Sequence, residues 1–291
     1  MRYILRNLQP LSLLVLLISS LGCQEIIEFD LPNTNPKLVI EGEMNFWEFK
    51  PENNMARVSI STSGSFYEEN TYNPVSDANV QIEDINSSRL YDIPPLEGTP
   101  GVYQNNAIPI ALGNSYRLRV DYGGNVYESE GTVLPVAELD SFTYRYRPNT
   151  PLLEPGYYFF FSGRTPKERG INYYRFKIYE NDSLYNQPED FLIQSDELLQ
   201  AQIDSLQLAD YSFDLTDTVR IEMYSLNQDV YEYYNQLLEL LFNDGGLFSS
   251  PPRNPDSNIV NTTNPDDPPL GFFQVSSVLD GGDVVESSEE D

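Results

Sequence analysis

The sequence predicts a mainly β protein, and two observations support this fold class. Short segments in which apolar and polar residues alternate strictly recur from residue 37 onward, as in Tyr116–Tyr122, and this period of two is typical of antiparallel strands with one face in a core. Turn-forming residues separate the segments, and Gly123, Gly124 and Asn125 predict a hairpin. About seven such segments fall within about a hundred residues, which is the size of an Ig-like or transthyretin-like β-sandwich.

Residues 37–136 are therefore predicted to form an N-terminal β-sandwich domain. In Tyr116–Tyr122, the apolar face is predicted to lie opposite Arg117, Arg119 and Asp121. Leu134 and Pro135 follow the last alternating segment and mark the expected boundary with a second domain. The expected strands, in chain order, are Lys37–Gly42, Ala56–Thr62, Ala78–Asp84, Arg89–Ile93, Gly101–Gln104, Tyr116–Tyr122 and Val126–Val133.

Residues 137–279 are predicted to form a β-rich C-terminal domain with one or two helices. A helix is expected near 227–242, because apolar residues recur at helical spacing and Ser225 with Gln228 fits a capping box. The segment Ser195–Leu208 is also compatible with a helix. The expected strands are Tyr157–Ser162, Tyr173–Glu180, Thr218–Tyr224 and Gly271–Val278. A long Pro/Asn-rich loop spans 249–269, and an acidic tail is expected at 280–291.

The first 22 residues have the layout of an export signal. Arg2 and Arg6 precede the apolar run Leu11–Ile18, which is too short to span a bilayer as a helix. Small residues then lead to Cys23, the only cysteine in the chain, which has no intramolecular disulfide partner. We therefore expect a signal peptide at 1–22, a covalent lipid on Cys23 that anchors the chain to the bilayer, and an acidic tether at 23–36.

Composition argues against several classes of function. The net charge of −28 disfavours binding to nucleic acid, because the phosphate backbone is anionic. The chain contains no histidine, which excludes Ser-His-Asp triads and histidine zinc ligands. We therefore expect no enzymatic activity, no catalytic residues, and no cofactor other than the lipid. A carboxylate-based hydrolase is the last-ranked alternative, because the 45 acidic residues offer many carboxylate pairs, and none of these pairs stands out in the sequence. Calcium at Asp266–Asp267 or Asp280–Asp283 remains an alternative to a solvated acidic loop, but neither segment fits an EF-hand, and no metal site is predicted.

Four groups of short motifs occur in a fixed order along the chain. They are Lys37–Gly42 after the lipidation signal; Pro74–Val80 followed by Gly101–Tyr103; Tyr116–Leu118 with Val126–Ser129; and Ser257–Ile259 leading to Leu270–Phe273. In this order the motifs resemble a lipoprotein family of Bacteroidota known as domain of unknown function number 4249. The resemblance implies an outer-membrane lipoprotein, commonly encoded beside TonB-dependent receptors of the SusC type, with no enzymatic activity and no known site residue beyond the lipidated cysteine. In such bacteria, acidic residues after that cysteine resemble a cell-surface export signal, which here would be Glu25, Glu28 and Asp30. Their spacing is looser than a compact acidic run, so an orientation facing the periplasm is the alternative.

The leading hypothesis is a non-catalytic accessory subunit of an outer-membrane β-barrel, either a SusC-like TonB-dependent receptor or the machinery that assembles surface proteins. The loop 249–269 and the helix beside it are the expected docking surface, with Phe248, Phe272 and Phe273 as apolar anchors. The alternative is a surface lipoprotein that binds a glycan or a peptide directly, with Trp47 at the contact, although Trp47 also fits a structural role at a strand end.

The chain also contains three Asp-Ser/Thr-aliphatic tripeptides, at Ser183, Ser205 and Thr218. They resemble the sites at which Bacteroidota O-glycosylate exported proteins. We expect these hydroxyls to be candidates for modification, with ordinary turn or strand residues as the alternative.

Overall fold

The computed structural model describes residues 36–64, 73–151, 153–167, 170–210, 212–243 and 251–286. A central sheet of nine strands organises this part of the chain, and its main path runs in the order β12-β11-β15-β17-β1-β2-β3, with β13 paired to β11 and β6 to β2. Its strands are β1 (Leu38–Trp47), β2 (Met55–Thr62), β3 (Asn73–Pro74), β6 (Val102–Asn105), β11 (Tyr173–Glu180), β12 (Ser183–Leu184), β13 (Leu192–Ser195), β15 (Thr218–Leu226) and β17 (Leu270–Val284).

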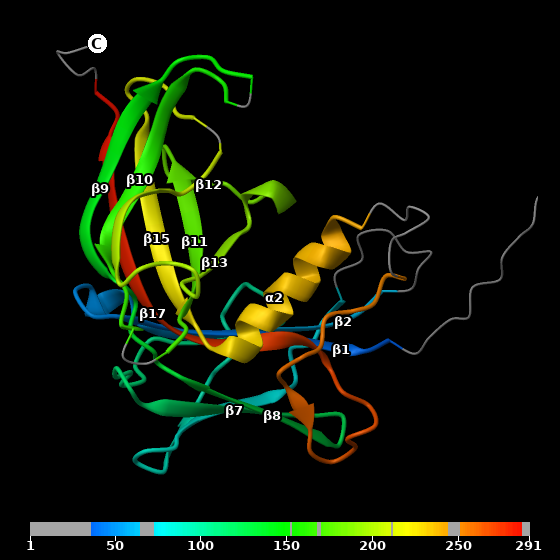
Figure 1. Ribbon diagram of the computed structural model, residues 1–291. Helices are drawn as coiled ribbons and strands as arrows, with labels where there is room; N and C mark the ends of the chain where they lie inside the picture. Colours follow the sequence, from blue (N-terminus) through cyan, green and yellow to red (C-terminus); the bar gives the residue numbers. More distant parts are fainter. Residues whose placement is uncertain are drawn as a thin grey trace, which may run out of the picture. The chain divides into compact units, whose positions relative to one another are not determined.

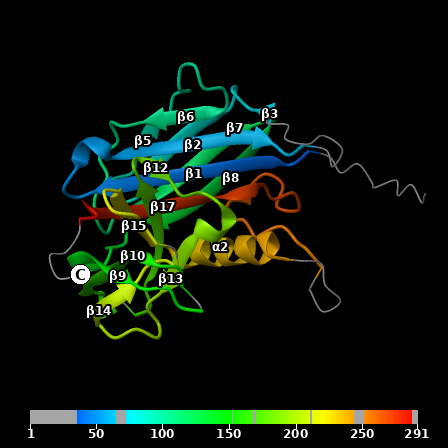
Figure 2. The ribbon, with the colours of Figure 1, turned by 90° about the horizontal axis from the view of Figure 1, so that it is seen from above.

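Strand β17 lies between β1, from the N-terminal part of the chain, and β15, from the C-terminal part. Its first part runs parallel to β1, from the pair Val39–Leu270 to the pair Trp47–Val278. Its second part runs antiparallel to β15, from Tyr224–Val278 to Thr218–Val284. Figure 1 shows β17 following β1 and then bending to follow β15, and Figure 2 shows β1, β2 and β17 side by side.

A five-stranded sheet packs on the part of the central sheet built from β1, β2 and β17. Its order is β16-β8-β7-β4-β5, with bounds Val260–Asn261, Asn125–Thr132, Ser115–Tyr122, Asn79–Asp84 and Arg89–Asp92. The buried residues between the two sheets include Ile40, Val58, Leu118, Val120 and Phe273. The predicted N-terminal β-sandwich is confirmed, and its strands begin or end within a few residues of the predicted bounds.

A three-stranded sheet of β9 (Glu138–Arg147), β10 (Gly156–Arg164) and β14 (Gln202–Gln207) packs on the part built from β11 and β15. A second core lies there and includes Phe159, Phe176 and Ile221. The segment Ser195–Leu208, which the sequence makes compatible with a helix, does not form one. The segment contributes β14 instead, with Ile203 buried and Leu198 95% exposed, because pairing with β10 satisfies its backbone groups in place of a helix.

Both cores lie on the same face of the central sheet. Directly paired residues of adjacent strands share a face, and Trp47, Val278 and Tyr224 form one such row. Met44 in β1 and Met223 in β15 are an odd number of positions from this row, so their side chains point to the opposite face of the sheet. Met44 lies in the first core and Met223 in the second. The other face of the sheet is therefore largely polar.

The single α-helix of the described residues, α2 (Gln228–Leu241), covers one end of this polar face. It packs through Val230 and Tyr234 against Phe272 and Leu226, on the inner side of the bend in the sheet (Figure 1). The helix expected near 227–242 is confirmed, but its capping box is wrong. The N-cap is Asn227, and the Ser225 hydroxyl, within β15, donates to the backbone oxygen of Leu134 at 2.7 Å. Among the described residues, the short 3-10 helices η1 (Pro51–Asn53) and η3 (Pro188–Asp190) lie in connections.

Residues 280–285 are more ordered than their composition indicates. Residues 280–284, expected in an acidic tail, belong to β17, and Val285 is fully buried in the second core. Two glycines permit this pairing: a Cβ at Gly282 would lie 2.0 Å from the backbone oxygen of Val219, and one at Gly281 would lie 2.3 Å from the Phe142 ring. Along the chain, the first core ends at Val133 and the second begins at Ala137, near the predicted boundary at 136. The first core also contains Ile259 and residues of β17, which come from the C-terminal part of the chain.

Candidate binding site

The candidate site is a pocket of about 610 Å³ on the polar face of the central sheet. Four adjacent strands, β1, β17, β15 and β11, form its floor, and the segment around η1 forms one wall. We call it the polar pocket. Its lining residues are Glu43, Asn45, Trp47, Lys50, Glu52, Asn53, Met55, Asn106, Lys177, Tyr179, Arg220, Glu222, Tyr224 and Asp280.

Glu222 is the centre of the hydrogen bonds in this pocket. One of its carboxylate oxygens accepts hydrogen bonds from the Tyr179 hydroxyl at 3.0 Å and from the Tyr224 hydroxyl at 2.6 Å, and the other pairs with Arg220. Burial, together with the Glu222 charge, raises the pKa of Tyr179 to about 12 and also raises the pKa of Tyr224. Both phenols therefore remain protonated donors at neutral pH, and the carboxylate has its partners within the protein.

Lys177 is less completely paired. Its Nζ atom lies 3.8 Å from a carboxylate oxygen of Glu43 and 4.5 Å from the centre of the Tyr224 ring. The side chain is only 15% exposed, and burial lowers its pKa, whereas the Glu43 charge acts in the opposite direction. An ammonium group has three hydrogen-bond donors, so this contact leaves donor capacity at the pocket.

Asn45 is the clearest unsatisfied group. It is 2% exposed, and its side-chain Oδ1 has no hydrogen-bond partner among the described residues. Buried polar side-chain atoms are nearly always hydrogen-bonded in folded proteins, so an orphaned acceptor at a pocket wall needs a reason. A bound donor group would supply that partner.

Trp47 lies at the end of β1 and is partly buried. The Lys50 Nζ atom lies 6.0 Å from the centre of the Trp47 ring and 2.5 Å from the Asp280 carboxylate. The charge of Lys50 is thus already neutralised by Asp280, and the indole adds an aromatic surface to a pocket otherwise lined mainly by polar groups.

A second concave surface is apolar, with a volume of about 480 Å³. We call it the apolar groove. It is lined by Phe46, Glu48, Phe49, Leu112, Pro135, Val136, Ala137, Glu138, Leu139, Ser277, Val278 and Leu279. Phe49 is 80% exposed and Leu112 is 45% exposed, so two large apolar side chains on this surface face solvent.

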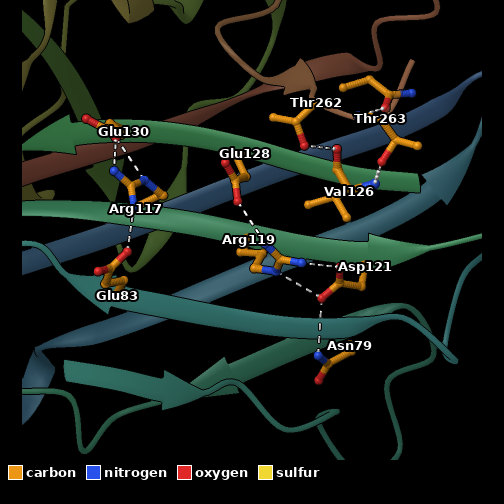
Figure 3. A network of polar contacts seen from close by, with 11 residues as sticks. Asn79, Glu83, Arg117, Arg119, Asp121, Val126, Glu128, Glu130, Thr262 and Thr263 are labelled. Carbon is orange, nitrogen blue, oxygen red and sulfur yellow. Dashed lines mark hydrogen bonds and ion pairs between the residues drawn. The ribbon is translucent and has the colours of Figure 1, made fainter. Parts of the chain in front are cut away.

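A second polar cluster lies on the outer face of the five-stranded sheet, where the sequence places Arg117 and Arg119. Arg117 bridges Glu83 at 2.7 Å and Glu130 at 2.6 Å, and Arg119 pairs with Asp121 at 2.9 Å and Glu128 at 3.0 Å (Figure 3). Each guanidinium is held between two carboxylates, so this cluster is a paired ladder of surface charges rather than a vacant anion site.

The apolar anchors expected from sequence at Phe272 and Phe273 are wrong. Phe273 is fully buried in the first core, and Phe272 is 8% exposed beneath α2, because both sides of β17 are covered at this point. Part of the 249–269 loop also packs on its own sheet, since Ile259 and Asn261 are each 1% exposed and Val260–Asn261 pair with β8 as β16. Phe272, Phe273, Ile259 and Asn261 are therefore not available for docking, whereas Val260 is 57% exposed.

Other predicted site residues are placed as follows. Cys23, Glu25, Glu28, Asp30 and Phe248 lie outside the described residues. Ser183, Ser205 and Thr218 are exposed. Within the described ranges there is no group of three or more His, Cys, Asp or Glu side chains arranged to hold a metal ion, and no helix there has both the length and the apolar character needed to cross a membrane.

Sequence reasoning singled out Trp47 but missed its neighbours Asn45, Lys177 and Glu222. A signal was present, because polar residues occupy alternate positions in strands of otherwise apolar character, as in Glu41, Glu43 and Asn45. Such positions are read as solvent-facing by default. Only the pairing of β1, β17, β15 and β11 shows that they line one pocket.

Comparisons with known proteins identify a family and a weakly similar solved structure. No curated protein matches the chain. Among solved structures, the FN1–FN3 domains of chicken CNTN1 are similar at 10% identity and a TM-score of 0.25, and the match covers 67% of this chain and 62% of that one. The chain thus spans less than two thirds of that structure, and a likeness this weak carries no argument. A family with the description "Domain of unknown function (DUF4249)" matches residues 24–281, and the chain belongs to this family.

Proposed function

We propose that this protein is a non-catalytic, lipid-anchored protein of the outer membrane, facing the cell surface, and that it acts as an accessory subunit of an outer-membrane β-barrel. The barrel would be a SusC-like TonB-dependent receptor or part of the machinery that assembles surface proteins. The export and lipidation motifs ending at Cys23 support the location. The apolar groove supports docking on another protein.

The observation that carries the docking proposal is the exposure of Phe49 and Leu112 at the apolar groove. Large apolar side chains that gather at a concave, solvent-facing surface mark contacts with other proteins, where such residues dominate the binding energy. The groove is built on a firm base, because β1, β9 and β17 each contribute side chains to it. Glu48 and Glu138 at the same surface supply polar groups of the kind found at the rim of an interface.

Co-purification tests this proposal. The tagged protein would be isolated from detergent-solubilised outer membranes as wild type, Phe49→Asp, Leu112→Asp and Leu198→Asp. Leu198 is 95% exposed and does not line the groove, so its substitution is the matched control. We expect each groove variant to reduce the yield of the co-purified β-barrel by about tenfold or more, with the control unchanged. An equal yield from folded Phe49→Asp protein and wild type would refute docking at the groove.

The membrane anchor has its own test. Intact mass or metabolic lipid labelling is expected to show acylation of Cys23, and Cys23→Ala protein is expected to be unmodified and soluble. Wild-type protein that is equally soluble and unmodified would contradict the anchor, whatever the outcome at the groove.

A second candidate function is direct binding of a glycan or a peptide at the surface. The specific observation that favours it is the polar pocket, in which Trp47 lies beside the unpaired Oδ1 of Asn45. The two candidates use different surfaces and are compatible with each other.

A further inference from the structure

We propose that the polar pocket binds a neutral sugar, with Asn45 and Lys177 as its hydrogen-bonding groups and Trp47 as its aromatic contact. This inference deepens the second candidate function and does not depend on docking at the apolar groove. It begins from the unpaired Asn45 Oδ1, since an acceptor that is buried at a pocket wall calls for a donor from a bound molecule.

Asn45 and Lys177 together favour a hydroxyl-bearing ligand. The Asn45 Oδ1 accepts a hydrogen bond, whereas the Lys177 ammonium donates, and its contact with Glu43 is long at 3.8 Å. A hydroxyl group both donates and accepts, so neighbouring hydroxyls of one sugar ring can satisfy both side chains. A ligand with only donors or only acceptors would leave one of them unpaired.

The charges of the pocket argue for a neutral ligand. Lys50, Lys177 and Arg220 are opposed there by Glu43, Glu222 and Asp280, and each cation has an acidic partner within 4.0 Å. A phosphate would have to displace one of these partners and leave its charge unpaired, which is costly at a partly buried site. Glu52 also lines the pocket, but it is exposed to solvent, where an ion pair with a polyamine contributes little. A neutral polyhydroxylated molecule adds hydrogen bonds without disturbing the ion pairs.

The position of the pocket argues for a sugar rather than a peptide. Extended peptides commonly bind by adding a strand to an exposed sheet edge. The floor of the polar pocket is instead the face of four adjacent strands, β11, β15, β17 and β1, whose backbone groups are already paired with one another. Recognition there depends on side chains. Trp47 supplies an apolar ring surface for the C–H groups of a sugar ring, and Glu222 holds the Tyr179 and Tyr224 hydroxyls in fixed positions.

The chain contains a single tryptophan, so intrinsic fluorescence reports on this pocket directly. The probes are glucose, galactose, mannose, xylose, N-acetylglucosamine, maltose and cellobiose, titrated into the full chain. Inorganic phosphate, spermidine and tetra-alanine serve as charged and peptide competitors. We expect at least one neutral sugar to change the Trp47 emission in a saturable manner, and none of the three competitors to do so with higher affinity.

Two variants test the assignment of the hydrogen-bonding groups. Asn45→Leu and Lys177→Met each keep most of the side-chain volume but remove the polar atom, and we expect each to weaken sugar binding by about tenfold or more. Lys37→Met, a matched change at a residue that does not line the pocket, is expected to bind as wild type does. Trp47→Phe, measured by calorimetry, is expected to weaken binding less than Asn45→Leu, because an aromatic ring remains.

A thermal melt separates loss of a ligand contact from loss of the fold. Asn45→Leu removes an unpaired buried acceptor, so it is expected to melt no lower than wild type while losing the sugar. The proposal is overturned if no sugar of the panel gives a saturable change, if phosphate, spermidine or the peptide binds more tightly than every sugar, or if both variants bind as wild type does. None of these results bears on the co-purified β-barrel, for which Lys177→Met is expected to behave as wild type.

Discussion

The side chain of Asn258 pairs with the backbone of Phe273 as a neighbouring strand would. Its Oδ1 accepts the Phe273 N–H at 2.8 Å, and its Nδ2 donates to the Phe273 carbonyl oxygen at 3.0 Å. The same amide also donates to Asp229 in the first turn of α2 at 2.8 Å. One side chain therefore connects the Pro/Asn-rich loop to β17 and to the helix. These contacts explain why the loop beyond residue 256 packs against its own domain.

Asn258→Ala is expected to destabilise the fold. It removes three hydrogen bonds and leaves the backbone groups of Phe273 without these partners, so we expect a loss of about 2 kcal/mol in the free energy of unfolding, measured by urea denaturation. Asn254→Ala, at an exposed position in the same loop, is the control and is expected to change stability by less than about 0.5 kcal/mol. Equal stability of the two variants would show that the Asn258 contacts contribute nothing.

Gly271→Ala is expected to damage the pairing of β17 with β1. Gly271 has φ +98, and a Cβ there would lie 2.0 Å from the backbone oxygen of Ile40. Gly98 has φ +78 with no atom within 4 Å of a Cβ, so Gly98→Ala isolates the backbone cost, about 1–2 kcal/mol. We expect Gly271→Ala to lose clearly more than Gly98→Ala in thermal and urea unfolding. Similar losses would mean that β1 moves aside without cost.

Asp196 is expected to make stability depend on pH in the acid range. Although burial raises the pKa of this fully buried carboxyl, hydrogen bonds from the Asn172 backbone N–H at 2.9 Å and side chain at 2.8 Å, together with Lys167 at 3.3 Å, hold it below its usual value. Because the folded-state pKa is the lower one, this contribution is complete above the unfolded value of about 4 and is lost as pH falls through the folded value.

Asp196→Asn tests this dependence. At pH 7 the variant is expected to lose about 1–3 kcal/mol, because hydrogen bonds to a charged acceptor are weakened, and the difference from wild type should shrink as the pH falls well below 4. Urea unfolding at several pH values measures it. Asp204→Asn, at an exposed position, should follow wild type throughout; a constant difference for Asp196→Asn across the whole range would contradict the assignment.

Ser183, Ser205 and Thr218 are expected to carry O-linked glycans in protein from the native host. All three are exposed, so a transferase can reach the folded protein, although the Ser205 hydroxyl accepts a hydrogen bond from Arg145 at 2.5 Å. Peptide mass spectrometry should detect the modification, and Ser183→Ala and Thr218→Ala should each remove it from the corresponding peptide. If the peptides that contain Ser183, Ser205 and Thr218 are all unmodified, the prediction is wrong.

Much of the local structure could be predicted from the sequence because it depends on short-range patterns. Strict alternation places Tyr116–Tyr122 in a half-buried strand, and helical spacing places a helix near 227–242, as observed. The pattern failed where tertiary pairing decided the outcome. Within Ser195–Leu208, residues Gln202–Gln207 form strand β14 rather than a helix, because β10 offers them a partner. Strand β9 was missed although aromatic and polar residues alternate from Phe142 to Arg147.

The sequence by itself determined that this chain is mainly β and acidic, without histidine and with a single cysteine, because these properties are local or compositional. Only the tertiary structure decided which polar residues act together. The parallel pairing of β1 with β17 joins residues more than two hundred positions apart, and no local pattern specifies such a partner. In the folded protein Phe273 lies in the first core and Phe272 lies beneath α2, although sequence reasoning placed both at a docking surface. The successive pairings of β1, β17, β15 and β11 bring Asn45, Lys177 and Glu222 to the same pocket as Trp47, because cross-strand neighbours share a face of the sheet.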